Sequence, residues 1–189
     1  NVEFLQNQWS DELLLASQCH PDLVARARAI GYPVRMYHTA SAGMDNAVPD
    51  PQAEFIGGGI TVGLTGACLV YTLGHRDIYL FGYDSSHAAG ASHAYAQAMN
   101  AGDEMVRCAV ENQVFDCSLA MAGQAHEFKR VSDMLARWGC ALHVYGEGLL
   151  PTMWRIWQRE RTQRVLTAVY DLGLCAPDFS FSPFLAAAE

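Results

Sequence analysis

A dense group of polar side chains follows the strand expected at residues 77–81. Carboxylates and imidazoles can exchange a proton with a substrate, and a carboxylate such as Asp84 can also hold Mg²⁺, because hard cations prefer oxygen ligands. Open α/β sheets bind ligands at the carboxyl ends of their strands. We therefore expect a functional loop here, with Asp84, His87 and His93 as catalytic residues and with Ser85, Ser86, Tyr95 and Gln97 as cofactor-binding residues.

Each of these side chains also has a structural explanation. Asp84 could cap a turn, and the histidines could simply be solvated. The density of polar groups over seventeen positions is what favours a functional loop. Strand-end position alone suggests further, weaker candidates, namely His20, His38, Thr39, Ser41 and Glu147, whereas His75, His126 and His143 fit structural or solvated roles.

A second chemical signal is the glycine-rich turn at residues 57–63, Gly-Gly-Gly-Ile-Thr-Val-Gly. Glycines without Cβ atoms let backbone N–H groups approach an anion, and a helix N-terminus adds partial positive charge. Thr61 could cap that helix or donate its hydroxyl group to a ligand oxygen. The turn lacks the Lys of a P-loop and only loosely fits the dinucleotide fingerprint. We expect phosphate contact from Gly57, Gly58, Gly59, Thr61 and Gly63, although a tight turn without a ligand would explain the glycines as well.

These groups must be positioned by alternating strands and helices. Apolar and β-branched runs predict strands at residues 12–17, 34–38, 54–56, 77–81 and 141–145, with helices at 21–30, 61–73 and 124–138. Residues 104–110 and 113–118 predict an antiparallel β-hairpin. The pattern favours an α/β, Rossmann-like fold with a mainly parallel sheet. We expect one domain at residues 1–151 and a helical or packing extension at 152–189.

The composition narrows the class of protein. The formal charge of −8 and a pI near 5.3 speak against a nucleic-acid partner. No apolar run approaches the length of a membrane span, and no signal peptide opens the chain, so we expect a cytoplasmic protein acting on a small molecule. The six cysteines show neither zinc spacing nor a disulfide pattern.

The order of these motifs resembles one known family. The glycine turn, the segment Leu-Gly-His-Arg-Asp-Ile-Tyr-Leu-Phe-Gly-Tyr-Asp-Ser-Ser at 73–86 and the His-Ala-Tyr at 93–95 look like the MptE-like 6-hydroxymethylpterin diphosphokinase family. The segments at 14–21 and 146–151 also resemble strand ends of that family. The resemblance covers about positions 12 to 151.

The resemblance implies a Rossmann-like fold and, as in archaeal members, Mg²⁺- and ATP-dependent transfer of diphosphate to a hydroxymethyl-dihydropterin. Bacterial relatives are linked to flagellin glycosylation and are similar to sialic-acid-type glycosyltransferases, which would use a CMP-sugar. By resemblance, the glycine turn would lie beside the nucleotide phosphates, while Asp84 and His93 would face the reacting centre.

One feature departs from the family pattern. Family members usually begin with an earlier strand and a Gly-rich turn containing Pro-Ser, and no such turn precedes Glu12. We therefore expect either a fragment of a longer protein or a protein that has lost this motif. A non-catalytic nucleotide-binding or scaffold module is the corresponding alternative to a transferase.

Overall fold

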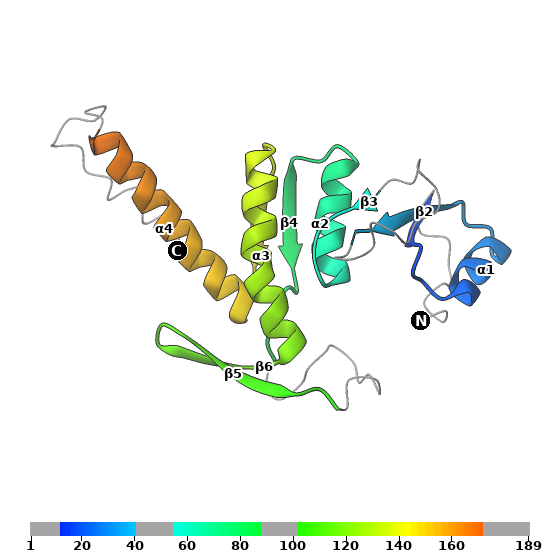
Figure 1. Cartoon of the computed structure of the whole chain (residues 1–189), viewed down its shortest axis with the longest axis horizontal. Helices are drawn as coiled ribbons and strands as arrows, with labels where there is room; N and C mark the ends of the chain where they lie inside the picture. Colours follow the sequence, from blue (N-terminus) through cyan, green and yellow to red (C-terminus); the bar gives the residue numbers. More distant parts are fainter. Residues whose placement is uncertain (1–11, 41–54, 88–101, 172–189) are drawn as a thin grey trace. The chain divides into compact units, whose positions relative to one another are not determined.

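A computed structural model describes residues 12–40, 55–87 and 102–171 (Figure 1). The described part is a mixed α/β protein with four helices, as the alternation of patterns predicted. It divides into two compact units, Asn1–Ile78 with Arg130–Ala141, and Tyr79–Lys129 with Leu142–Glu189.

The first unit contains a parallel sheet in the order β1-β2-β3, formed by β1 (Leu13–Ala16), β2 (Val34–Thr39) and β3 (Phe55–Ile56). Helix α1 (Pro21–Ala29) connects β1 to β2. It begins at a proline, which suits the first helical turn, and the ring nitrogen Nδ1 of His20 accepts a hydrogen bond from the Asp22 N–H at 3.3 Å. Leu15, Ala27 and Tyr32 form the buried core beneath this β-α-β segment.

Helix α2 (Val62–Thr72) follows β3 through the glycine turn. The Thr61 hydroxyl oxygen accepts a hydrogen bond from the Leu64 N–H at 3.4 Å, so Thr61 caps the helix. At the other end the guanidinium of Arg76 donates to the carbonyl of Tyr71 and lies over its ring, 4.2 Å from the centroid. Both ends of α2 are therefore fixed by side chains next to it in sequence.

The second unit contains the hairpin of β5 (Met105–Val110) and β6 (Gln113–Ser118). The antiparallel register runs from Met105 opposite Ser118 to Val110 opposite Gln113, which confirms the predicted hairpin. Glu111, at the turn, has φ 51°, a left-handed conformation that glycine would adopt more easily. The Glu111 carboxylate pairs with Arg159.

Strands β4 (Asp77–Phe81) and β7 (Ala141–Tyr145) form a further pair. Their buried side chains, Ile78, Leu80, Leu142 and Val144, alternate with exposed ones. On the exposed side, Tyr79 stacks on His143 and Phe81 stacks on Tyr145, with ring centroids 4.5 and 4.9 Å apart.

The two longest helices are α3 (Leu119–Arg137) and α4 (Leu149–Asp171). The prediction that the first of these begins near Gln124 was wrong by five residues, because the Ser118 hydroxyl caps the helix by accepting from the Met121 N–H at 3.2 Å. Gly123 inside the helix hid this extension in the sequence. Helix α4 runs without interruption through 151 and 152, the boundary predicted between domain and extension.

The described strands form three sheets, β1-β2-β3, β4-β7 and β5-β6. The α/β class and the parallel strand pairing are confirmed, and a continuous Rossmann-like sheet stays a prediction. Across the described ranges, no helix combines the length and apolar character needed to span a bilayer.

Candidate functional site

The carboxyl ends of β1 and β2 bring four polar side chains together, which we name the strand-end cluster: Ser17, Gln18, His38 and Thr39. The His38 ring nitrogen Nδ1 lies 2.8 Å from the Ser17 hydroxyl oxygen, and the Thr39 hydroxyl donates to the Gln18 amide oxygen at 3.1 Å. The parallel register places these residues side by side, since Ala16 faces Tyr37 just before the strands end. The weak prediction that His38 and Thr39 border a functional edge thus gains a defined set of neighbours.

The glycine turn leaves the same edge of the sheet. His38 faces Phe55 and Thr39 faces Ile56 in the register of β2 and β3, and the Ala40 N–H donates to the Ile56 carbonyl at 3.0 Å. Gly57 therefore directly follows Ile56, the residue that lies opposite Thr39. The His38 ring also contacts the Phe55 ring, with 5.6 Å between centroids. Carboxyl edges of parallel strands, followed by a turn into a helix, are where α/β proteins bind ligands.

The three consecutive glycines have different reasons to be glycine. A Cβ atom on Gly58 would lie 2.6 Å from the Thr65 Cα, so the close contact of this turn with α2 excludes any side chain. Gly59 has φ 124°, a conformation that L-residues rarely adopt. At Gly57, by contrast, a Cβ atom would meet nothing within 4 Å among the described residues. The fold explains Gly58 and Gly59 and leaves Gly57 unexplained.

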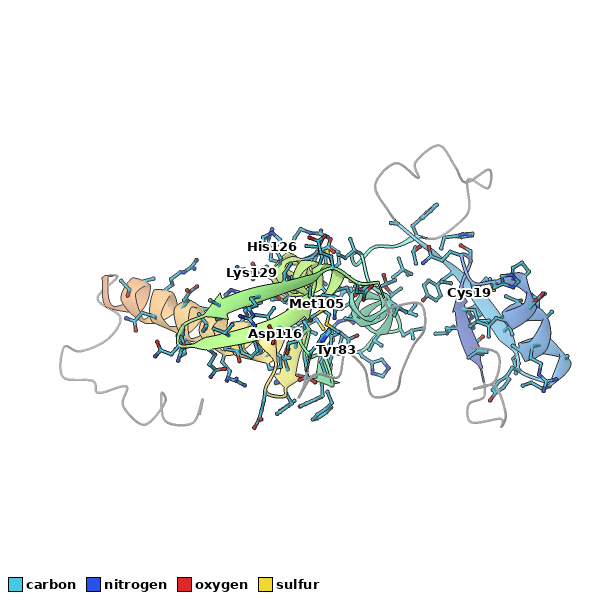
Figure 2. All side chains as sticks on the ribbon, turned by 90° about the horizontal axis from the view of Figure 1, so that it is seen from below. Cys19, Tyr83, Met105, Asp116, His126 and Lys129 are labelled. Atoms are coloured by element: carbon cyan, nitrogen blue, oxygen red, sulfur yellow. The ribbon has the colours of Figure 1, made fainter. Side chains whose placement is uncertain are left out.

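The electrostatics of this edge suit an anion. The first backbone N–H groups of a helix have no acceptor within the helix and carry a partial positive charge. Helix α2 has no acidic residue in its first turn to compete for them. On β2, burial raises the pKa of Tyr37, and the nearby Cys19 thiol raises it further, so this phenol stays neutral. Figure 2 marks Cys19 in this unit.

The Asp84 loop belongs to the second unit, where it packs on the turn that precedes α4. The Ser86 hydroxyl accepts from the Leu149 N–H at 3.2 Å, and the Asp84 carbonyl accepts from the Leu150 N–H at 3.0 Å. A Cβ atom on Gly148 would lie 2.4 Å from the Asp84 carbonyl oxygen, and one on Gly146 would lie 2.5 Å from the Asp84 carboxylate. The loop therefore caps α4, a structural role that the sequence left open for Asp84.

Two polar atoms of this loop are buried without a hydrogen-bond partner among the described residues, the Ser85 hydroxyl and the ring nitrogen Nε2 of His87. Ser85 also has φ 50°, which costs a residue with a side chain about 1 kcal/mol or more. Beside it, burial raises the pKa of Tyr83. Strained backbone and unsatisfied polar groups concentrate at functional loops. The Asp84 loop therefore remains a candidate functional loop in addition to capping α4.

Several predicted site residues are not tested by these observations. His93, Tyr95 and Gln97 lie outside the described residues, as does Ser41. The roles predicted for Gly63, Asp84, His87, Ser85 and Ser86 stay predictions. No cluster of three or more metal-ligating side chains occurs within 12–40, 55–87 and 102–171. Mg²⁺ binding by Asp84 stays a prediction.

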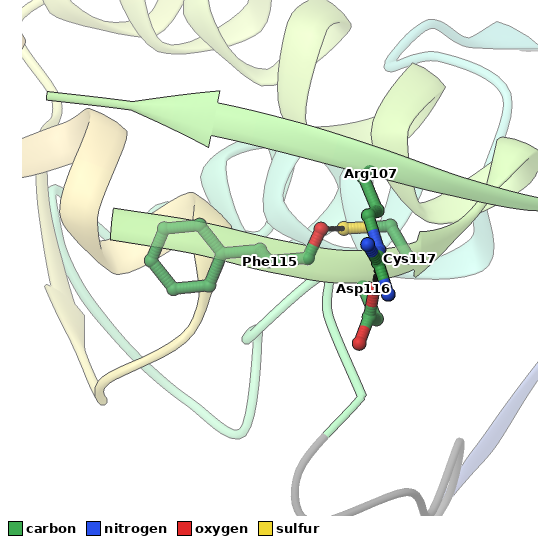
Figure 3. Close-up of polar contacts among 4 residues, drawn as sticks. All are labelled: Arg107, Phe115, Asp116 and Cys117. Atoms are coloured by element: carbon green, nitrogen blue, oxygen red, sulfur yellow. Dashed lines mark hydrogen bonds and ion pairs between the residues drawn. The ribbon is translucent and has the colours of Figure 1, made fainter. Parts of the chain in front are cut away.

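The hairpin face that carries Arg107 and Asp116 was missed from the sequence. The Arg107 Nε lies 3.1 Å from the Asp116 Oδ1, and Figure 3 shows the two side chains meeting across the strands. The sequence could have predicted this ion pair. In a hairpin that turns at Glu111 and Asn112, position 107 lies opposite position 116.

The chain matches no known family model, no curated protein and no solved structure.

Proposed function

We propose that this chain is a nucleotide-dependent transferase whose glycine turn binds the phosphate groups of its nucleotide. The observation that supports this most is Gly57, a glycine at the carboxyl end of β3 where the described fold would accept a side chain. A ligand phosphate that approaches the backbone at Gly57 would explain why this position has no side chain.

The residues of this edge fit phosphate binding. Backbone N–H groups of the turn and of the first turn of α2 are donors for phosphate oxygens. His38, held by Ser17 at 2.8 Å, carries a second ring nitrogen that could donate to the same group. Thr39 and Gln18 bond to each other, which fixes the neighbouring polar groups. Preorganised donors of this kind stabilise the charge that develops during phosphoryl transfer.

The reaction that we propose first is transfer of diphosphate from ATP to a hydroxymethylpterin-like acceptor. The acceptor hydroxyl oxygen forms a bond to the β-phosphorus, the bond from that phosphorus to the α-phosphate oxygen breaks, and AMP leaves. The hydroxyl proton passes to a base, for which Asp84 and His93 are the candidates by resemblance, and His87 by its residue type and its position in the loop. Bound Mg²⁺ would neutralise charge on the phosphates.

A non-catalytic module is the second candidate, because Asp84 and Ser86 are engaged in capping α4. A glycosyltransferase using a CMP-sugar would share the phosphate site and differ in its acceptor. The choice of nucleotide therefore separates the two transferases.

The test is a thermal-shift panel of ATP, CMP and a pterin, with and without Mg²⁺, on wild type, Gly57→Ala and Gly57→Val. We expect ATP to raise the melting temperature of wild type, since a ligand of the native state stabilises it. Both variants should keep the unliganded melting temperature and lose the shift, with Val losing more than Ala, because each added methyl group blocks the approach to the backbone.

Gly66→Ala is the matched control, since Gly66 lies inside α2 and a Cβ atom there also meets nothing within 4 Å. It should raise stability by up to about 1 kcal/mol through helix propensity and leave the nucleotide shift unchanged. A shift with CMP alone would favour the glycosyltransferase. An undiminished ATP shift in Gly57→Val would contradict the proposed phosphate site.

A further inference from the structure

The outer face of the hairpin borders a cavity of about 890 Å³. Among its lining residues are His87 from the Asp84 loop, Met105 and Arg107 from β5, and Val114 and Asp116 from β6. Figure 2 labels Met105 and Asp116 on the two strands. The register puts these four strand residues on one face of the hairpin, because side chains alternate along each strand. The volume is in the range of small-molecule sites.

The polar part of this lining is an ion pair, and both of its side chains have further hydrogen-bonding groups available to a ligand. Arg107 contacts the Asp116 Oδ1 through its Nε at 3.1 Å. A guanidinium has five N–H donors, and a carboxylate has two acceptor oxygens, so one such contact uses only part of either group. Both side chains are more than half exposed. Donors and acceptors thus lie side by side at the surface, with no net charge.

His87 adds a third polar group. Its backbone N–H donates to the Asp116 carbonyl at 2.8 Å, which fixes the residue against β6. Its ring nitrogen Nε2 is buried and has no hydrogen-bond partner within the described part of the chain. Buried polar groups nearly always have a partner, in the protein, in water or in a ligand.

The remaining contribution is apolar. Met105 and Val114 are 49% and 66% exposed, which is high for large hydrophobic residues on a folded surface. They flank the ion pair on the same face, so a ligand that bonds to Arg107 and Asp116 would also cover apolar surface.

We propose that this cavity binds a neutral ligand rich in hydroxyl groups, of the size of a monosaccharide or a cyclic polyol. A hydroxyl group accepts from Arg107 and donates to Asp116 at once, without separating the ion pair. His87 lines the cavity beside Asp116, and the C–H groups of the ring contact Met105 and Val114. Because the Arg107–Asp116 pair has no net charge, its field gives neither an anionic nor a cationic ligand an advantage over a neutral one. The site uses none of the residues proposed for phosphate binding.

Saturation-transfer difference NMR tests this on the full chain, with methyl α-D-glucopyranoside and myo-inositol as neutral probes and with glucuronate and glucosamine as charged ones. We expect saturable transfer to a neutral probe with a dissociation constant in the millimolar range. Arg107→Gln and Asp116→Asn should each weaken it by about tenfold or more, the effect of losing a hydrogen bond to a charged group.

The matched control is Arg35→Gln, which removes an exposed ion pair of similar geometry, Arg35 with Glu12 at 2.9 Å, from the other unit. It should leave transfer unchanged, as should Gly57→Val, so that failure of the phosphate site and failure of this one are distinguishable. The proposal is overturned by absence of saturable transfer to both neutral probes, by tighter binding of a charged probe, or by wild-type binding in the Arg107 and Asp116 variants.

Discussion

At the scale of single residues, the structure separates glycines that the sequence presents as equivalent. Gly58 is required by the Thr65 backbone and Gly59 by its φ angle, whereas Gly57 has no structural requirement within the described residues. Sequence alone identified the turn and could not divide it, because the division depends on how closely α2 approaches. Within the turn, the proposed phosphate contact is therefore best tested at Gly57.

Gly58→Ala is expected to behave unlike Gly57→Ala. The added Cβ atom would lie 2.6 Å from the Thr65 Cα and 2.8 Å from the Leu64 carbonyl oxygen, so backbone must move. We expect a loss of about 2 to 3 kcal/mol in the free energy of unfolding, measured by urea denaturation. Stability equal to that of Gly57→Ala would show that the close contact is absent in solution.

The fully buried Cys117 gives a residue-scale prediction about pH. Burial, with the neighbouring Cys108 thiol as a further cause, raises its pKa from 9.0 to about 12. Because the folded pKa is above the unfolded one, the stability due to the neutral thiol is present below pH 9 and is lost as the pH rises from about 9 towards 12. The slope should approach 1.4 kcal/mol per pH unit at most, by the order-of-magnitude relation between pKa and free energy.

Urea unfolding of wild type and Cys117→Ala between pH 8 and pH 10.5 tests this. The variant should be less stable at pH 8, because it leaves a cavity, and should lose less stability with rising pH. Cys19→Ala, at a partly exposed thiol of the other unit, controls for general alkaline effects. Parallel pH profiles in all three proteins would contradict the expectation.

At the scale of elements, the local sequence predicted the positions of most strands and helices. Strand β4, strand β7 and the hairpin lie where alternation and turn residues placed them, because their patterns are set by neighbours in the chain. The start of α3 was missed, since the Ser118 cap precedes a glycine-containing stretch that reads as a turn. Contacts between distant segments, such as Ser17 with His38 or Ser86 with α4, require the register and could not be read from local patterns.

Ser86 gives the prediction for this scale. Its hydroxyl accepts from the first N–H group of α4, so Ser86→Ala should lower the free energy of unfolding by about 1 kcal/mol. Ser86→Thr keeps a hydroxyl group and should restore most of the loss. If neither variant differs from wild type, the cap does not stabilise the helix. The measurement is the unfolding midpoint in urea, together with helicity by circular dichroism.

At the scale of the whole molecule, the charge distribution sets what the protein can bind. The chain carries twenty acidic and twelve basic residues, and four of its arginines fall in α4 between 155 and 164. Three of these four are engaged, Arg155 with the Gly146 carbonyl, Arg159 with Glu111 and Arg164 with Glu160. The two carboxylate pairs reduce the positive charge that this helix offers to a phosphate backbone.

We accordingly expect no saturable binding of a labelled duplex or single-stranded DNA at protein concentrations on the order of 100 µM in low salt, where non-specific binders already respond. Fluorescence anisotropy measures this. Tight, salt-sensitive binding would overturn the exclusion of nucleic acid, and Arg161→Gln would then locate it.

The cap on α4 has a consequence for detecting ligands. The amides of Leu149 and Leu150 are held by Ser86 and Asp84, two residues of the loop with predicted chemistry. The hydrogen-exchange rates of these two amides therefore depend on whether the loop stays in contact with α4. A ligand that draws the Asp84 loop towards itself would deprotect both amides, and one that fastens the loop would slow their exchange. Two backbone protons can therefore report occupancy before any turnover is measured.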